Sequence, residues 1–175
     1  MREIMVWYAA QTFYCREEHV ASFLEGKGCT CFIPMCYDEQ DTHEGKKERI
    51  LVPAIHNLIF IQKTFEDYEL NAKKKECPFP LHVIRNRETK RYYEIPDSQM
   101  AEFRAICDPS YKGTIYIDAM TAEAKPGQKV RVIRGTFKGL IGKLVRHKNR
   151  SYVIVTLAAL GVMVHIPKWY CEKTQ

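Results

Sequence analysis

The sequence lacks any hydrophobic run long enough to cross a membrane. Its longest nearly apolar run, Val153 to Val164, contains Thr156 and Gly161 and falls short of the roughly 20 residues that a spanning helix needs. The first residues also lack the apolar core of a signal peptide. We therefore expect a cytoplasmic protein that does not enter a membrane.

The seven cysteines lack the Cys-x-x-Cys doublets of a zinc site, and their odd number does not suit a disulfide framework. Cys29, Cys31 and Cys36 could be combined with His19 or His43 as metal ligands. However, Cys29 and Cys31 lie in a run that predicts a strand, and small buried thiols are the better interpretation. We expect no metal and no cofactor.

Enzyme signatures are also missing. Gly142-Lys143 is not a phosphate-binding loop, because Phe137 stands where that motif requires its first glycine. No Gly-x-Ser-x-Gly, His-Glu-x-x-His or calcium-loop pattern occurs, and the six histidines are scattered. These absences favour a binding protein over an enzyme.

Acidic side chains are nearly absent from the last third of the chain. Residues 124–175 carry 11 basic and 1 acidic side chains, a net charge of +10, whereas residues 1–123 carry 16 basic and 20 acidic, a net charge of −4. The C-terminal segment should therefore attract a polyanion, while the larger segment should not. This division predicts two domains with different tasks.

The first 118 residues alternate between strand and helix patterns. In residues 17–27, for example, Val20, Phe23 and Leu24 follow the helical spacing i, i+3, i+4. A highly charged stretch at 38–49 predicts an exposed loop or hairpin tip. The whole segment predicts an α+β domain with one sheet. The expected strands are 5–10, 30–37, 57–61, 81–86 and 91–95, and the expected helices are 17–27, 65–75 and one opening at Pro96-Asp97-Ser98.

The pattern changes to strands alone near residue 125. Short strands at 129–134, 140–145, 152–157 and 162–166, separated by turn signals, predict a small closed β-barrel. We therefore place an N-terminal domain at 1–118, a linker at 119–124 and a C-terminal domain at 125–175.

The C-terminal segment resembles a KOW motif, which forms an SH3-like β-barrel. The residues that carry the resemblance are Pro126, Gly127, Val130, Val132, Gly135, Phe137, Gly139 and Gly142. Glycines allow turns and sharp bends that a Cβ would strain, and Phe137 fills the space they leave.

The N-terminal segment resembles the N-terminal domain of the NusG family, an α/β sandwich with a mainly antiparallel sheet. The matching features are Trp7-Tyr8, the helix near Glu17, Phe32-Ile33-Pro34, the strand Leu58 to Ile61, and Ile95-Pro96-Asp97. The resemblance implies a non-enzymatic transcription elongation factor that acts as a monomer. Its N-terminal domain would bind the clamp helices of the largest RNA polymerase subunits and suppress pausing, and its KOW domain would recruit a second partner.

Mapped onto this sequence, the polymerase-binding concavity would be lined by Leu58 and Phe60, with Ile55, Met100 and Phe103 as neighbours. Leu58 and Phe60 point to one face of the predicted strand and Ile59 and Ile61 to the other. The alternative is that these side chains belong to the core, and this alternative is stronger for Met100 and Phe103.

Departures from the family pattern favour a specialised member. Asn57-Leu58 replaces the usual Gly-Tyr, and Cys15 replaces a usual glycine, so the chain resembles RfaH and the UpxY antiterminators of capsular polysaccharide operons. The general, housekeeping factor remains an alternative. Specialised members read the non-template DNA strand between the first strand and the first helix.

In that region Phe13 or Tyr14 could stack on a base, and Arg16 or His19 could contact phosphate or a base edge. Lys73, Lys74 and Lys75 could add phosphate contacts or form a solvated helix end. The C-terminal domain could bind a ribosomal protein, Rho or RNA. Because KOW barrels also occur in ribosomal proteins, an RNA-binding or ribosome-associated module is the second alternative.

Overall fold

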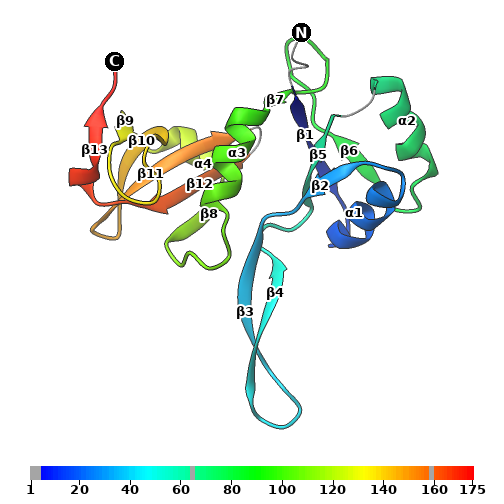
Figure 1. The fold of residues 1–175 in the computed structure, drawn as a ribbon, viewed down its shortest axis with the longest axis horizontal. Helices are drawn as coiled ribbons and strands as arrows, with labels where there is room; N and C mark the ends of the chain where they lie inside the picture. The colour runs from blue at the N-terminus through cyan, green and yellow to red at the C-terminus, as the bar shows by residue number, and fades with distance from the viewer. Residues whose placement is uncertain (1–4, 64–65, 158–159) are drawn as a thin grey trace. The chain divides into compact units, whose positions relative to one another are not determined.

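A computed structural model describes residues 5–63, 66–157 and 160–175 (Figure 1). The chain forms two compact units that divide between Met100 and Ala101, inside helix α3 (Asp97–Ile106). In the described ranges, no helix is long and apolar enough to cross a membrane. Each unit contains an antiparallel sheet and at least one helix that packs against it.

The N-terminal unit contains a five-stranded sheet. Strands β2 (Thr30–Phe32), β5 (Leu58–Gln62), β1 (Val6–Thr12) and β6 (Leu81–Val83) lie in that order, and β7 (Ile95–Pro96) also pairs with β1. All pairings are antiparallel. The strands at the centre of this sheet, β1 and β5, are its most apolar segments and are almost completely buried.

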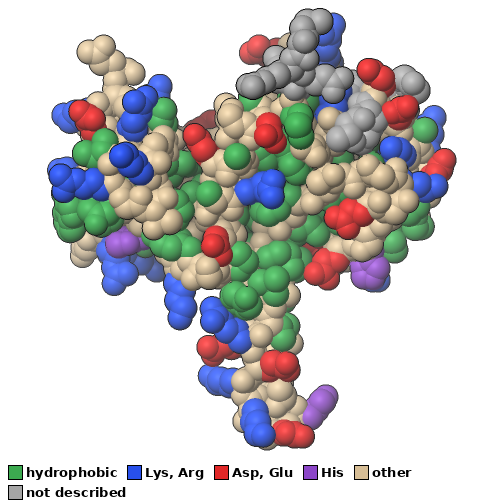
Figure 2. Space-filling view, in the orientation of Figure 1, with side chains coloured by type: hydrophobic (Ala, Val, Ile, Leu, Met, Phe, Trp, Pro, Cys, Tyr) green, Lys and Arg blue, Asp and Glu red, His purple; other side chains and the backbone are tan. Residues whose placement is uncertain are grey.

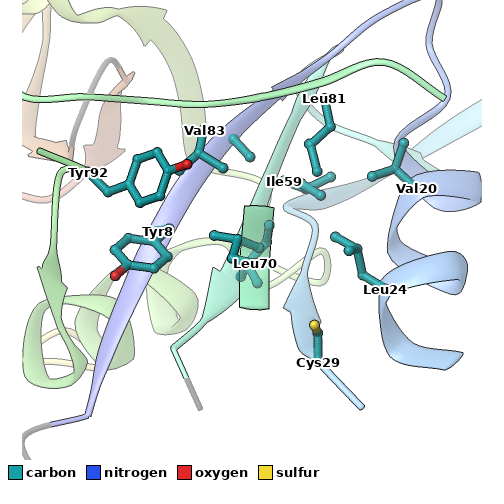
Figure 3. Close-up of a cluster of buried hydrophobic side chains, with 11 residues drawn as sticks. Tyr8, Val20, Leu24, Cys29, Ile59, Leu70, Leu81, Val83 and Tyr92 are labelled. Atoms are coloured by element: carbon teal, nitrogen blue, oxygen red, sulfur yellow. The ribbon is translucent and has the colours of Figure 1, made fainter. Parts of the chain in front are cut away.

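Helices α1 (Glu17–Gly26) and α2 (Asp67–Glu76) cover one face of this sheet (Figure 3). Val20 and Leu24 from α1 and Leu70 from α2 pack against Tyr8 and Ile59 of the two central strands. Each of these side chains is 0% exposed, so this cluster is the core of the unit. The helical stripe predicted from Val20 and Leu24 therefore faces the sheet as expected.

The charged stretch forms a β-ribbon that projects from the N-terminal unit (Figure 1). Strand β3 (Met35–Asp41) pairs with β4 (Lys47–Pro53) over their whole length. The predicted strand 30–37 is thus wrong as one element, because it splits around Pro34, which has no N–H to donate to a ladder. The sequence predicts an exposed loop or hairpin tip at 38–49, and the structure forms a hairpin. Its strands extend into this polar stretch as far as Asp41 and Lys47.

The C-terminal unit contains one antiparallel sheet in the order β13-β9-β10-β11-β12-β8. Its strands are β8 (Thr114–Asp118), β9 (Gln128–Val132), β10 (Ile141–His147), β11 (Arg150–Leu157), β12 (Leu160–His165) and β13 (Cys171–Lys173). The pairs formed by the described residues do not join β13 to β8. The structure therefore confirms the α+β class, with an all-antiparallel C-terminal region.

Residues 114–124 differ from the sequence prediction. Residues 114–118, which the sequence pattern places in the first domain without predicting a strand, form β8 and pair with β12 of the C-terminal sheet. Residues 119–124, expected as a linker, form helix α4 (Ala119–Ala124), whose last carbonyls at Ala122 and Glu123 accept hydrogen bonds of 2.7 and 3.1 Å from Lys143 Nζ. The limits of the independently folding domains stay a prediction, which a fragment experiment tests below.

Candidate functional site

The turn between β1 and α1 has an unusual backbone that is fixed from a distant loop. Tyr14 and Cys15 have φ angles of 59° and 51°, in the left-handed region that side chains seldom adopt. The Cys15 N–H donates to Asn57 Oδ1 at 3.0 Å, and the Thr12 N–H donates to the Asn57 carbonyl oxygen at 3.1 Å. Asn57 thus holds both ends of the turn, and its own φ of 62° is one that asparagine tolerates better than most residues.

A buried carboxylate completes this attachment. Glu17, the first residue of α1, is only 2% exposed, and its Oε1 accepts a hydrogen bond from the Asn57 N–H. His56 Nδ1 lies 3.7 Å from the same oxygen. A buried charged group needs such partners, and a carboxylate in the first turn also interacts favourably with the helix dipole. Glu17 and Asn57 therefore connect the helix, the turn and the start of β5.

The turn presents the predicted nucleic-acid residues at the surface. Tyr14 is 82% exposed and Phe13 is 37% exposed, while Arg16 and His19 are also exposed. The His19 ring lies 5.4 Å from the ring of Phe79. The structure thus brings an aromatic pair and a cation together on one short segment, which suits contact with an unstacked base and its phosphate.

The lysine run lies on another element. Lys73, Lys74 and Lys75 form the last turn of α2, where positive charge complements the helix C-terminus. Glu76 follows them and forms an ion pair with Lys27 at 2.7 Å, and this hydrogen bond lowers the pKa of Glu76. Lys75 is exposed, whereas Lys73 and Lys74 are half-buried. Both sequence-based interpretations, phosphate contacts and a solvated helix end, stay predictions.

The face of the sheet opposite α1 and α2 carries Leu58 and Phe60, two of the five predicted polymerase-binding residues. Phe60 pairs with Ala9 on β1 and with Phe32 on β2, and the Phe32 and Phe60 rings lie 6.3 Å apart. Residues that are paired across an antiparallel ladder point to the same side of the sheet. Phe60 therefore points to the face of the sheet opposite the one that carries Ile59, and the Ile59 face packs against α1 and α2.

All predicted members of the concavity except Ile55 are buried in this structure. Leu58 is 8% exposed, Phe60, Met100 and Phe103 are 0% exposed, and Ile55 is half-buried. Burial of Met100 and Phe103 agrees with the core alternative. A polymerase-binding role for these five residues stays a prediction.

Three side chains near the turn are of types that bind metal ions. The ligand atoms of Cys15, Glu17 and His56 lie within 4.8 Å of one another. Glu17 Oε1 already accepts a hydrogen bond from the Asn57 N–H, so this oxygen has a partner without an ion. Among the cysteines considered from the sequence, burial raises the pKa of Cys31 to about 12, which keeps its thiol protonated and unsuited to metal binding. The expected absence of a metal stays a prediction.

Two glycines of the C-terminal segment are required for different structural reasons. Gly135 has a φ of +83° in the turn after β9, as the turn interpretation requires. Gly142 lies inside β10, where an added Cβ would collide with the Ile154 carbonyl oxygen and lie 2.6 Å from Val153 Cγ1. Gly142 thus serves close strand packing rather than the predicted sharp bend.

Sequence reasoning identified the turn but missed what holds it. From the sequence, Glu17 only marks a helix that resembles the family pattern, and Asn57 is only a departure from that pattern. The available signal was the combination of an asparagine before a strand with an acidic residue at a helix start. No local pattern places residues 40 positions apart in contact.

Two family models match the chain. One, described as transcription termination factor nusG, matches residues 5–104, and the other, described as the KOW motif, matches residues 126–156. The first match spans more than half of the chain and includes the β1–α1 turn, Asn57 and β5. The second covers β9, β10 and most of β11. No curated protein matches the chain in a sequence search.

Proposed function

We propose, from the premise that this chain belongs to the NusG family, that it binds RNA polymerase and suppresses pausing and termination in particular operons. Family membership makes it a transcription elongation or termination regulator with a KOW motif, and members of this family are not enzymes. The finer assignment, an antiterminator of the kind represented by RfaH and the UpxY proteins, is our proposal. It rests on the turn held by Asn57.

The polymerase-binding surface in this proposal is the Phe60 face of the N-terminal sheet. Leu58 and Phe60 lie on this face, and Phe32 adds a second aromatic ring beside Phe60. Phe60 is 0% exposed here, so this proposal requires that the side chains covering Phe60 move aside before it can act as an aromatic hot spot for the partner. The clamp helices of the largest polymerase subunits are the proposed partner, and Ile55, Met100 and Phe103 are further candidate contact residues.

The proposed DNA site is the segment from Phe13 to His19. The observation that carries it is the exposure of Tyr14, 82%, on a turn whose backbone is fixed by Asn57. A large exposed ring on a fixed backbone loses little conformational entropy when it stacks on a base. Arg16 supplies a neighbouring charge for phosphate. The partner is the exposed non-template DNA strand.

Replacing Tyr14 by alanine should weaken DNA binding without changing stability. Loss of one base-stacking contact of about 1–3 kcal/mol corresponds to roughly 5- to 150-fold weaker affinity for a single-stranded oligonucleotide of the non-template sequence. Fluorescence anisotropy of the labelled strand measures this change. Tyr37→Ala is the matched control, because Tyr37 is also exposed, at 45%, but lies on the β3–β4 ribbon. Equal losses in both variants would contradict the proposed site.

Operon specificity can be tested by deleting the gene. We expect reduced RNA from the promoter-distal genes of one or a few long operons, measured as the distal-to-proximal read ratio by RNA sequencing. A change in this ratio across most transcription units would instead support the general NusG factor. The same experiment thus separates the two forms of the proposal.

The C-terminal sheet would recruit the second partner. A ribosomal protein, Rho and RNA remain the candidates, and the positive charge of residues 124–175 suits RNA or an acidic protein surface. The alternative of an RNA-binding or ribosome-associated protein is weakened by the family match over residues 5–104, because that match covers more than half of the chain and lies outside the KOW motif.

A further inference from the structure

An aromatic pocket lies at one end of the C-terminal sheet. It has a volume of about 230 Å³ and lies between the loop after β9 and the segment before β13. Its lining includes Tyr111, Phe137 and Tyr170, with Arg134 and His165 as basic residues. Drug-sized ligands usually occupy pockets of about 300 Å³ or more, so this one suits a single planar group.

The backbone holds the two sides of the pocket together. The Ile133 N–H donates to the Tyr170 carbonyl oxygen at 2.8 Å, which joins the β9 loop to the segment 167–170. Gly135 lets the two approach closely, because an added Cβ would lie 2.9 Å from Tyr170 Cε2. Tyr111 donates to the His165 carbonyl oxygen at 2.7 Å and packs edge-on against Phe137 at 4.9 Å. The aromatic groups are therefore positioned before any ligand arrives.

An exposed tryptophan stands beside this pocket. Trp169 is 75% exposed and is followed directly by Tyr170, whose ring lies 6.5 Å away. Most tryptophans bury a large part of their surface, so such exposure marks a candidate contact. The chain has one other tryptophan, Trp7, and its side chain is only 2% exposed.

The surroundings of the pocket are basic and unneutralised. Arg134, Lys138 and Lys168 are exposed, and they form no ion pair with any residue that the structure describes. No acidic residue is among those that line the pocket. Lys and Arg side chains gather over the visible face of this unit in Figure 2. These basic residues therefore favour a partner that carries negative charges at regular intervals along its backbone.

We propose that this pocket and Trp169 bind single-stranded RNA, with a base stacked on an aromatic ring and phosphates near Arg134 and Lys168. Aromatic platforms beside cations are the usual arrangement in single-strand recognition. The inference rests on the proposed function that the C-terminal unit recruits a second partner, and it names that partner. RNA is preferred to DNA in this proposal because the N-terminal turn is the proposed site for the non-template DNA strand, which leaves the transcript as the other single strand at an elongating polymerase.

The test uses the full chain and a labelled 12-nucleotide oligouridylate, followed by fluorescence anisotropy. Trp169→Ala and Arg134→Glu should each weaken binding about tenfold at low salt, as expected for loss of a stacking or phosphate contact. Arg146→Glu is the matched control, because Arg146 is an exposed residue of β10 outside the pocket. It should weaken binding no more than about threefold, through the general field alone.

Three results would overturn the inference. The first is absence of oligouridylate binding by the unaltered chain, and the second is an equal loss in Arg146→Glu and Arg134→Glu, which would indicate diffuse attraction. The third is equally tight binding of the deoxy oligonucleotide, which would remove the assignment to RNA. Copurification of Trp169→Ala with RNA polymerase should be unchanged. The Phe60→Ala variant is expected to lose copurification with RNA polymerase and to keep RNA binding. The RNA proposal and the polymerase proposal can therefore fail independently of each other.

Discussion

Phe60→Ala is expected to abolish copurification with RNA polymerase, whereas Ile59→Ala retains it. The two residues are neighbours on β5 and both are 0% exposed. Ile59 belongs to the cluster beneath α1 and α2, while Phe60 lies on the opposite face beside Phe32. Only Phe60 belongs to the proposed polymerase-binding face.

Both substitutions create cavities, so each serves as the stability control for the other. Deleting a buried phenylalanine side chain costs about 3–5 kcal/mol and a buried isoleucine about 2–5 kcal/mol. Because a domain is stable by only about 5–15 kcal/mol, melting curves must show that both variants are folded at the assay temperature. Pull-down of polymerase from equal amounts of folded protein then gives the comparison. Polymerase binding by Phe60→Ala, or its loss in both folded variants, would remove the proposed docking face.

This comparison depends on a feature that the sequence does predict, namely which residues share a face of β5. The alternation of Leu58 and Phe60 with Ile59 and Ile61 follows from the period of two in any strand. The observed pairing of Ile59 with Ala10 and of Phe60 with Ala9 agrees with it. Local periodicity was therefore sufficient here, because the strand is short, central and apolar on both sides.

The conformation of the turn that carries Tyr14 cannot be predicted from the periodicity of the sequence. Its aromatic residues are visible in the sequence, but the conformation depends on Asn57 and on the buried Glu17. Neither contact follows from helical or strand periodicity, because each joins residues about 40 positions apart. A polar residue at a helix start is normally solvated, so burial of Glu17 is a tertiary effect that overrides the local preference.

Strand β8 was missed for a different reason. Its residues Ile115 and Ile117 alternate with polar or aromatic neighbours, but five residues after a turn carry little signal, and they precede the basic segment. The charge boundary near residue 124 therefore does not coincide with the structural division at Met100 and Ala101. Charge reports the surface chemistry of a segment, whereas β8 joins the C-terminal sheet through backbone pairing and apolar contacts.

A fragment of residues 108–175 is accordingly expected to fold, and a fragment of 125–175 to be unfolded or much less stable. Ala122 of α4 belongs to the buried cluster that contains Ile154 and Met163, and the partly buried Ile115 and Ile117 of β8 pack against this cluster. Around Gly161, Ala122 and Ile117 lie so close that an added Cβ would meet Ala122 Cβ at 2.6 Å. The shorter fragment loses this packing and the antiparallel pairing of β8 with β12. Small domains have little stability to spare.

Far-UV circular dichroism and thermal melting decide this prediction. The longer fragment should give a β-type spectrum and a cooperative transition, with a midpoint at least about 10 °C above any transition of the shorter one, because each kcal/mol shifts the midpoint of so small a domain by several degrees. Within the longer fragment, Ile117→Asn should lower the midpoint, whereas Met120→Asn should not, since Met120 is 80% exposed. Equal midpoints for the two fragments would contradict this prediction and support the domain boundary at 119–124 that the sequence predicts. A helical spectrum would instead indicate a fold switch like that of RfaH, which the β-branched residues Val153, Val155 and Val162 disfavour.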